Sequence, residues 1–542
     1  MRTRRVFALL LALLTLLVLP GCAYDPTVDQ YYYMNIGAEP STLDPQTASD
    51  SGALTVIGNC FEGLLRLGED GELLPAVARR YEVSEDGLTY TFYLRRDVRW
   101  RTAASAQKDS TEKPPSVTAD DFVFAFQRLF DPVTAAPSAE TFLCIRNASR
   151  ILEGRAEPSS VGVRADGDYT LIFELESPNV DFLYLLTTAA AMPCSRAFFA
   201  STGGRYGLEA DELLCNGPFY VSMWEHGYRV VTRRSLVYYD AAAVLPAGVS
   251  FYVDEEKNWL YTFRTGDTDC ILVHGYDAEG LRDDGYQTAD LHNTTWVLVF
   301  NPKSENFSSR SLRRALAMSL DRTALGNVLP SYMEEAGAIV PPDVRLGGQN
   351  YRQSAGNDLA LAFDLEAART ALRQGLALLE LEDMPAFTML VPDSGQHALL
   401  ASSFQNVWQK DLLAFANIQT LPLSSIYERI ASGNWTAALL PLTAQYDDPS
   451  AVLRISAVNG EENLYTSGQS AYEELLTNAA STPVRSEALA QYRKAEEYLI
   501  SEGLVVPLYY ETTTYAMGRN VSGIEISPFG GQLYFAYARK KA

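Results

Sequence analysis

The sequence predicts a large α/β protein built from two or more lobes. Its 542 residues are several times the length of a typical single-core domain, and 47% of them are hydrophobic, enough to fill a large interior. Helical and strand patterns alternate along the chain, and neither a sequence repeat nor a long low-complexity linker separates them. This alternation favours intertwined α/β lobes over independent domains in a row.

The N-terminus has the form of a secretory signal. Three arginines precede an uncharged apolar run over residues 6–19, which is too short and wrongly flanked for a stable transmembrane span. The run ends at Leu19-Pro-Gly-Cys22, which resembles a bacterial lipobox with a proline where a small residue is usual. We expect removal of residues 1–21 and attachment of diacylglycerol to Cys22, with ordinary cleavage or an uncleaved anchor as the alternatives.

Composition restricts the location and the partners of the chain. No second hydrophobic run of spanning length follows the signal, so we expect lipid alone to hold the protein at the outer face of the cytoplasmic membrane, or in the periplasm. The chain has 44 basic and 67 acidic side chains and a formal net charge of −23. Nucleic acids and anionic membranes require clustered Lys and Arg, so neither is an expected partner.

Cysteine and histidine spacing argues against a metal or catalytic centre. Besides Cys22 the chain has five cysteines, an odd number without a Cys-x-x-Cys pair, which favours buried thiols with at most two disulfides. The histidines form no His-Glu-x-x-His pair, and neither a Gly-x-Ser-x-Gly elbow nor a Walker A loop is present. We therefore expect no enzyme activity and no cofactor. The five cysteines are Cys60, Cys144, Cys194, Cys215 and Cys270.

Several elements have clear local patterns. Residues 89–94 alternate apolar and polar side chains, which predicts a half-buried strand. Residues 103–116 are polar and end in prolines, which indicates a surface insertion. Residues 118–130 predict a helix with a capping box and a phenylalanine stripe facing the core. Near the C-terminus an amphipathic helix is predicted to end at Gly503, followed by a buried strand to residue 510.

Three segments, in order and spacing, resemble the N-terminal signature of the oligopeptide-binding proteins that feed ABC importers. They are residues 37–45, residues 61–100, which begin with Phe-Glu-Gly-Leu, and residues 117–132. The likeness continues at Asn216-Gly-Pro-Phe-Tyr220, at residues 311–322 and at residues 492–510, so it covers nearly the whole mature chain. On these segments the chain is identified as a member of the bacterial extracellular solute-binding proteins of family 5, which bind oligopeptides, dipeptides or nickel.

The resemblance implies a two-lobed α/β fold of the periplasmic-binding-protein (Venus-flytrap) type. Mixed sheets, an extra N-terminal subdomain and a two-segment hinge near His292 and Glu511 belong to this expectation. Ligand contact with both lobes is expected to favour the closed form. The expected divisions are lobe I at residues 24–60, 193–293 and 512–542, its extra subdomain at 61–192, and lobe II at 294–511.

The resemblance also implies a function. We expect a monomeric, membrane-anchored receptor that binds peptides or a related small solute and delivers them to separate permease and ATPase chains. A binder of a non-peptide solute, such as an oligosaccharide or a metal chelate, is the alternative on the same scaffold. Four histidines weaken the nickel-chelate version, whereas 31 tyrosines and six tryptophans are compatible with stacking on sugars. A secreted enzyme is more remote, because nucleophile and metal motifs are missing.

The residues that anchor peptides in relatives differ here. Relatives commonly carry Trp-x-x-Asp ahead of an acid-Pro step, and that Asp pairs with the peptide ammonium. In this chain Leu442 replaces the Trp and Gln445 replaces the Asp, so the anchor is uncharged. We infer that Asp447 or Asp448 takes over the ammonium, or that the ligand has no free amine there. For Asp448 a turn and helix N-cap is the preferred role.

Two further substitutions lie near the same place. Leu439 occupies a position where some relatives hold an Arg for the peptide carboxylate. Thr294 and Thr443 occupy positions where some relatives have two bridged cysteines. The two threonines are therefore a consistent pair of replacements.

Other expected ligand contacts also come from the resemblance. The loop after residue 45 pairs its backbone with an extended peptide in relatives, as in strand addition. His397 matches a position near the ligand carboxylate, with a surface or core histidine as the alternative. Tyr509 and Tyr510 end the hinge strand, where a cleft floor and core packing are equally open. The expected ligand-binding residues are Ser49, Asp50, Ser51, His397, Gln445, Tyr446, Asp447 and Tyr510.

Overall fold

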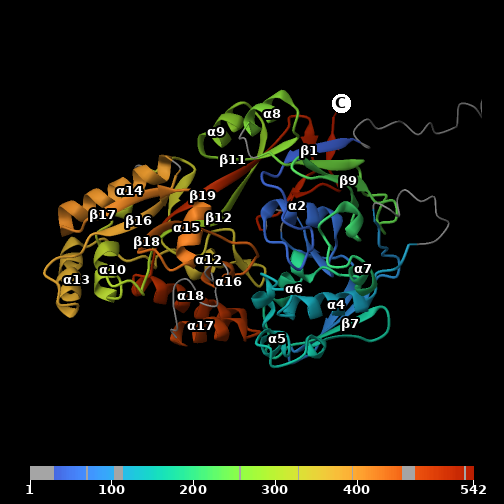
Figure 1. The fold of residues 1–542 in the computed structure, drawn as a ribbon, viewed down its shortest axis with the longest axis horizontal. Helices are drawn as coiled ribbons and strands as arrows, with labels where there is room; N and C mark the ends of the chain where they lie inside the picture. The colour runs from blue at the N-terminus through green and yellow to red at the C-terminus, as the bar shows by residue number, and fades with distance from the viewer. Residues whose placement is uncertain are drawn as a thin grey trace, which may run out of the picture.

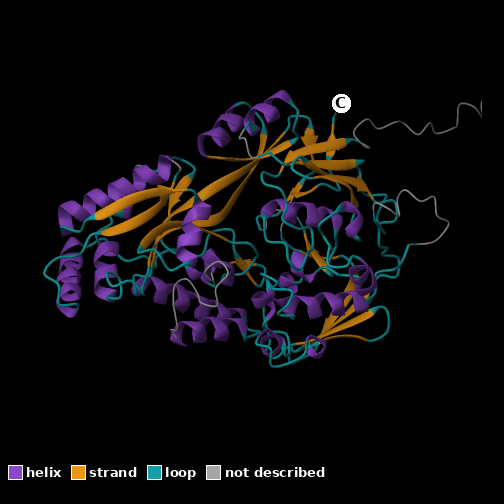
Figure 2. Cartoon of the chain, viewed as in Figure 1, coloured by secondary structure: helices purple, strands orange, loops and turns teal. Residues whose placement is uncertain are grey.

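The computed structural model describes residues 30–68, 71–102, 114–254, 258–326, 329–393, 395–454, 470–529 and 533–541. The signal segment and Cys22, and most of the insertion expected at residues 103–116, lie outside the described residues. Two α/β bodies lie side by side, and long strands run from one into the other (Figures 1 and 2). Within the described ranges, no helix combines the length and apolar character that a membrane span requires.

One mixed sheet runs through both bodies. Its strand order is β17-β16-β18-β12-β19-β11-β1-β10-β9-β8, and β13 pairs with β19. The two connecting strands are β12 (Gln287–Phe300) and β19 (Val505–Met517). The first lobe holds β1 (Tyr31–Asn35), β8 (Phe219–Glu225), β9 (Arg229–Arg234), β10 (Gly248–Tyr252) and β11 (Cys270–His274). The second lobe holds β13 (Met333–Glu335), β16 (Phe387–Pro392), β17 (Ala416–Leu421) and β18 (Ala437–Thr443).

Strands β12 and β19 cross between the lobes at a break in their register. Leu291 pairs with Thr513, whereas Thr294 pairs with Glu511, so β12 has one extra residue between the two pairs. Such irregularities bend a strand pair locally. His292 and Glu511, the expected crossing points, lie at this break. The predicted two-lobed fold with two crossing segments is confirmed.

A four-stranded antiparallel sheet forms the far end of the first lobe. Its strand order is β4 (Ala78–Val83), β5 (Thr89–Leu94), β7 (Thr170–Glu174) and β6 (Val163–Ala165). Every second residue of β5 is buried, as the alternation predicts. Helix α4 (Ala119–Phe130) covers the sheet, and its Phe126 ring lies 5.0 Å from that of Phe173. The Thr118 amide donates to Asp121 Oδ2 at 2.8 Å, which confirms the predicted capping box.

The remaining elements are short or cover the sheets. In the first lobe the helices are α2 (Ser51–Cys60), α5 (Ala148–Leu152), α6 (Phe182–Leu185), α7 (Arg196–Ser201), α8 (Trp259–Thr265) and α9 (Gly275–Asp283). In the second lobe they are α10 (Arg310–Met318), α11 (Arg322–Gly326), α12 (Tyr351–Ala355), α13 (Leu365–Leu378), α14 (Gly395–Val407), α15 (Leu423–Ala431), α16 (Ser450–Leu453), α17 (Ser470–Ala480) and α18 (Arg485–Ser501). Short strand pairs are β2 (Leu65–Leu67) with β3 (Leu73–Pro75), β14 (Arg345–Leu346) with β15 (Gln349–Asn350), β20 (Val521–Ser522) with β23 (Arg539–Lys540), and β21 (Glu525–Ile526) with β22 (Leu533–Tyr534).

Short turns complete the chain. Four 3₁₀ turns occur at Ala139–Phe142, Pro158–Ser160, Ala189–Ala191 and Ala210–Glu212, and a π-helical turn at Trp408–Leu412 extends α14. Helix α18 ends ahead of Gly503, which has φ of 65°, and β19 begins two residues later. The predicted helix, stop and buried strand are therefore confirmed, but the strand does not end at residue 510: it continues to Met517.

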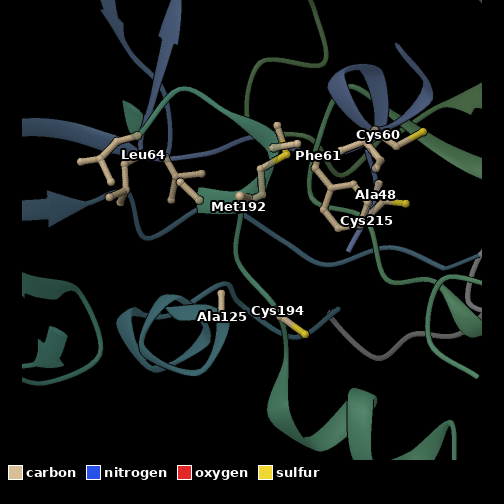
Figure 3. Packing of buried hydrophobic residues seen from close by; sticks show 14 of the residues in the cluster. Ala48, Cys60, Phe61, Leu64, Ala125, Met192, Cys194 and Cys215 are labelled. Atoms are coloured by element: carbon tan, nitrogen blue, oxygen red, sulfur yellow. The ribbon is translucent and has the colours of Figure 1, made fainter. Parts of the chain in front are cut away.

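Each lobe has its own hydrophobic core. In the first lobe, Phe61 and Met192 belong to one hydrophobic cluster, and Figure 3 shows Ala48 and Cys215 beside Phe61. All five cysteines outside the signal are buried and unbridged, in agreement with their expected role as buried thiols. In the second lobe, β16 and the π-helical turn pack through Phe387 and Trp408. Stable cores on both sides leave the junction between them as the place for a ligand.

Candidate functional site

A cavity of about 440 Å³ lies at the junction of the two lobes. The first lobe contributes the face of α2, strand β2, the segments 137–144 and 179–192, and the segment around 525–534. The second lobe contributes the segment 445–454, which follows β18, together with Arg345 of β14. A cavity of this size is typical of sites for small ligands.

Four of the residues expected to bind ligand line this cavity. Ser49 and Gln445 are exposed and reach it from opposite lobes. Tyr446 is half-buried and packs against the hydrophobic core of the first lobe, although it belongs to the second. Asp447 lines the cavity with its side chain only 4% exposed. The structure therefore brings together residues that are some 400 positions apart in the sequence.

Asp50 and Ser51 are not among the residues that line the cavity. Asp50 is the N-cap of α2: its Oδ1 accepts from the Ala53 amide at 2.7 Å, and its Oδ2 accepts from the Ser41 hydroxyl at 3.2 Å. Ser51 begins the helix, and its carbonyl accepts from the Thr55 hydroxyl at 2.9 Å. The resemblance placed a ligand contact here, but the observed side chains start a helix.

His397 and Tyr510 also lie away from this cavity. His397 packs against the Trp296 ring with centroids 3.7 Å apart, and its Nδ1 lies 2.7 Å from the Tyr509 hydroxyl. Burial lowers the pKa of His397 to about 4, so the ring is neutral near pH 7. The Tyr510 hydroxyl donates to Asn357 Oδ1 at 2.7 Å. Both contacts are packing interactions of the second lobe, the alternative that the sequence left open.

The two neighbouring acids of the 445–454 segment have different environments. Asp448 Oδ1 accepts from the Ser450 amide at 2.6 Å and from the Tyr492 hydroxyl at 3.1 Å, which forms the turn into α16. Asp447 Oδ1 accepts from the Arg345 amide at 2.7 Å, but its buried Oδ2 has no hydrogen-bond partner. Burial raises the pKa of Asp447 to about 6. The expected turn role of Asp448 agrees with these contacts.

The lobes touch each other directly beside the cavity. The Gly347 amide, in the turn between β14 and β15, donates to Asp181 Oδ1 at 2.6 Å. Asn179 Nδ2 donates to the Ala480 carbonyl at 3.2 Å. Burial and the neighbouring Asp448 carboxylate raise the pKa of Asp181. The lobes are therefore in contact, and the arrangement is closed.

Sequence reasoning missed these bridging residues. Asp181 lies in a loop segment that matches no motif, and Gly347 lies in a two-residue turn of a short hairpin. The glycine pair at residues 347–348 is a turn signal, and it was the only sequence feature that could have drawn attention to this hairpin. Its partner across the junction has no local signature.

The two threonines predicted to form a pair near β18 are in contact in the structure. Thr294 and Thr443 face each other on β12 and β18, and their hydroxyl oxygens are 2.9 Å apart. The pair thus occupies adjacent positions, as replacements for a disulfide would. Leu439 and Leu442 are both buried to 99% in hydrophobic clusters. Neither leucine lines the cavity, whereas Gln445, four residues after β18 residue Pro441, does.

Glu62 is a second carboxylate in the cavity wall. Its Oε1 accepts from the hydroxyls of Tyr238 at 2.9 Å and Tyr239 at 3.1 Å, while its buried Oε2 has no hydrogen-bond partner. Burial raises the pKa of Glu62 to about 7. Glu62 belongs to the Phe-Glu-Gly-Leu segment that begins at residue 61, but the sequence indicated no role for it. Over the described ranges, no three His, Cys, Asp or Glu side chains are arranged to hold a metal ion.

Comparison with known proteins places the chain in a family. The model of bacterial extracellular solute-binding proteins, family 5 (middle region), matches residues 72–463. The dipeptide-binding protein DppE of Bacillus subtilis is 26% identical over 505 residues, which cover 93% of this chain and 90% of that protein. The oligopeptide-binding protein OppA of the same species is 27% identical over 518 residues, 93% of this chain and 92% of that protein.

The fold has a solved counterpart as well. The substrate-binding domain of an oligopeptide ABC transporter from Bacillus anthracis superposes with a TM-score of 0.78 at 25% identity. The match covers 95% of this chain and 100% of that one. The cavity at the junction of the lobes and the match over most of the sequence lead to one assignment. The chain belongs to the bacterial extracellular solute-binding proteins of family 5.

Proposed function

We propose that this protein is the solute receptor of an ABC importer and that it binds peptides in the cavity between its lobes. The observation that carries the proposal is a cavity lined by both lobes in a chain whose relatives DppE and OppA are named dipeptide- and oligopeptide-binding proteins. Gln445, Tyr446 and Asp447 line this cavity from one lobe, and Ser49 lines it from the other.

The function requires binding and release but no chemical step. A ligand that touches both lobes binds the closed form better than the open form, so it shifts the population toward closure. The break in register between β12 and β19 is where the lobes rotate. A permease that recognises the closed form then receives only loaded receptors.

The membrane association is the finer part of the proposal. The tetrapeptide at residues 19–22 supports lipid attachment at Cys22, which would keep a monomeric receptor at the outer face of the membrane beside its permease and ATPase chains. We divide the chain as the sequence suggests, with a hinge between residues 293 and 294 and between residues 511 and 512.

The test is to identify what the protein carries. The chain from Ala23 onward is purified, and its mass is recorded under native conditions and again after denaturation. The proposal expects a released series of peptide masses. Protein that has been unfolded, stripped and refolded is the control, and it should release nothing. A single non-peptide mass would support the alternative solute binder instead.

If denaturation releases no small molecule, the cavity was empty and a second measurement follows. Stripped protein is mixed with a pool of random tetrapeptides and its thermal unfolding is followed, because a ligand that binds only the folded form raises Tm. A rise in Tm with the peptide pool supports the proposal. No rise with peptides, together with a rise for sugars or metal chelates, would overturn it.

A further inference from the structure

Two buried carboxyl groups from opposite lobes meet at the junction. Asp181 directly precedes α6 of the first lobe and is 2% exposed, and Asp448 of the second lobe is 4% exposed. The two carboxyl groups are within hydrogen-bond reach of each other. Ionised carboxylates repel each other and only accept hydrogen bonds, so one of the two must hold a proton for this contact to form. The contact between the lobes therefore includes a proton.

The surrounding hydrogen bonds assign this proton to Asp181. Asp448 Oδ1 accepts from the Ser450 amide at 2.6 Å and from the Tyr492 hydroxyl at 3.1 Å, and both donors stabilise its ionised form. The described donor to Asp181 is the Gly347 amide, 2.6 Å from Oδ1. Among the described residues, neither carboxyl group forms an ion pair, because the guanidinium of this cluster, that of Arg345, is paired at 4.0 Å with the neighbouring Asp447.

The groups that act on Asp181 belong to the opposite lobe. Burial raises the pKa of Asp181 well above its ordinary value, and the carboxylates of Asp448 and Asp447 raise it further. The Gly347 amide, which lowers the pKa, also comes from the second lobe. When the lobes separate, Asp181 loses all three neighbours and gains water. The affinity of Asp181 for its proton thus depends on closure.

The other two acids with raised pKa values in the cavity wall lack this dependence on the opposite lobe. The groups that act on Glu62 lie in the first lobe, as Glu62 does: Tyr238, Tyr239, Arg66 and Arg95. The groups that act on Asp447 lie in the second lobe, as Asp447 does: Arg345, Asp448 and Asp343. Opening of the junction leaves these neighbours in place. Asp181 is therefore the acid of this wall whose charged neighbours are lost on opening.

The remaining titratable groups around the pair keep one charge state between pH 5 and pH 7. Burial raises the pKa of Tyr184 in α6 and that of Tyr492 in α18, and it raises the pKa values of Cys144 and Tyr446 to about 12. All four groups are neutral in this range. Arg454, whose charge acts on Tyr492 and Tyr446, stays protonated. A change in this range is therefore assigned to the carboxyl groups.

We propose that closure of the lobes takes up one proton at Asp181, which Asp181 donates to Asp448 across the junction, so that acid favours the closed form and alkali favours release. The proton comes from solvent on closure and returns to solvent on opening. This inference rests on the proposed function, because it describes how closure around the same cavity is regulated.

The direction of the effect follows from the two states of Asp181. In the open form the side chain is in water and its pKa is near the ordinary value of 3.8, whereas in the closed form the pKa is raised. Between these two values the closed form holds one proton more than the open form. Closure is therefore most favourable at low pH and weakens by up to about tenfold for each pH unit as pH rises. Peptide affinity is expected to change in the same direction, because ligand binds the closed form better.

The test measures peptide binding at pH 5, 6 and 7. Stripped protein is equilibrated with random tetrapeptides of Ala, Ser, Leu and Gln, whose terminal charges stay nearly constant over this range. Retained peptide is quantified by mass spectrometry. Wild type is expected to lose affinity by about ten- to a hundredfold from pH 5 to pH 7. Mixing protein and peptides in weakly buffered solution at pH 6 should also raise the pH, because each binding event takes up a proton.

Three variants assign the effect to the pair. Asp181→Asn resembles the protonated acid, because its amide oxygen can accept from the Gly347 amide while its amide N–H donates to Asp448. This variant should bind equally well at all three pH values and should retain more peptide than wild type at pH 7. Asp448→Asn removes the like charge from the other side and should also flatten the pH dependence. Asp120→Asn, which removes a carboxylate that is 67% exposed in the first lobe, should keep the wild-type fall.

The outcomes separate the two proposals. Equal retention by wild type at all three pH values, or an equally steep fall in well-folded Asp181→Asn, overturns the proton-linked closure but leaves peptide binding intact. Retention at no pH overturns the proposed function. Small-angle scattering without peptide then decides the inference, which expects a smaller radius of gyration for wild type at pH 5 than at pH 7; equal values overturn it. The wild-type measurements stand even if a variant does not fold.

Discussion

At the scale of single residues, the character of the cavity depends on which carboxylates already have partners. Asp448 and Asp181 accept hydrogen bonds from the protein itself, whereas Asp447 and Glu62 each keep one buried oxygen without a hydrogen-bond partner. A buried acceptor that stays unpaired costs about 1–3 kcal/mol, so these two oxygens are unfavourable groups of the cavity wall. Asp447 and Asp448 are adjacent in the sequence, but their carboxylates have different hydrogen-bond partners.

Replacing Glu62 by Gln should change how stability depends on pH. The folded pKa of about 7 is above the ordinary value of 4.5, so the folded protein keeps a proton that the unfolded chain releases between these two pH values. The free energy of unfolding therefore falls as pH rises from 4.5 to 7, by up to about 3 kcal/mol. Glu62→Gln removes this penalty.

Urea unfolding of wild type and Glu62→Gln at pH 5 and pH 8 measures the effect. The free energy of unfolding of the variant minus that of wild type should be larger at pH 8 than at pH 5. Asp358→Asn removes one exposed charge and should show no such difference. A constant difference between Glu62→Gln and wild type at both pH values would contradict the raised pKa.

At the scale of elements, local signals place helices and strands correctly but do not say what their ends touch. The capping box of α4 and the glycine stop after α18 were readable because cap and helix are neighbours in sequence. Asp50, at the start of α2, was expected to contact ligand through family resemblance. Its observed partners are the Ala53 amide and Ser41, which are the partners of a cap.

Asp50→Ala should therefore destabilise the fold without a direct effect on the ligand. Loss of an N-cap of this kind costs about 0.5–2 kcal/mol. Asp50→Asn keeps an oxygen that caps the helix and should stay close to wild type. Denaturant unfolding and retention of the tetrapeptide pool are measured on both variants. Weaker peptide retention by the well-folded Asp50→Asn would instead favour ligand contact at this residue.

At the scale of the whole molecule, two kinds of connection join the lobes: the strand pair β12–β19 and the contacts across the junction. The β12–β19 pair runs through both lobes, and its register shifts between Leu291 and Thr294 and again between Trp296 and Val297. The contacts across the junction combine hydrogen bonds, such as those of Asp181 and Asn179, with the packing of Tyr446 and Val180 against the core of the opposite lobe. Interfaces between domains of one chain commonly allow relative motion unless they are large and hydrophobic.

Small-angle scattering should detect this opening. Stripped wild type is expected to have a larger radius of gyration than the same protein with tetrapeptides, because ligand favours closure. Refilling the cavity should restore the compact form. Identical scattering curves with and without bound peptide would argue against hinge closure. A protein that binds no peptide is measured with and without the same tetrapeptides, as the control for changes in scattering caused by the added peptides.

Sequence patterns predicted several elements, and family resemblance predicted the two-lobed fold and the family. Period-two and helical patterns arise from neighbours on the same strand or helix, so they predicted the β5 strand and the α4 and α18 helices. The resemblance also located the crossing near His292 and Glu511 and paired Thr294 with Thr443, because family likeness extends along the chain.

The residues that line the cavity could be identified only in the folded chain. The hydrogen bond from the Arg345 amide to Asp447 joins residues 102 positions apart, and the bond from the Gly347 amide to Asp181 across the junction joins residues 166 positions apart. No local pattern encodes such pairs. His397 and Tyr510 were expected at the cavity, yet their partners Tyr509 and Asn357 place them in the second lobe's packing. Burial and hydrogen bonding are set by partners that are distant in the chain, and these exist only after the chain has folded.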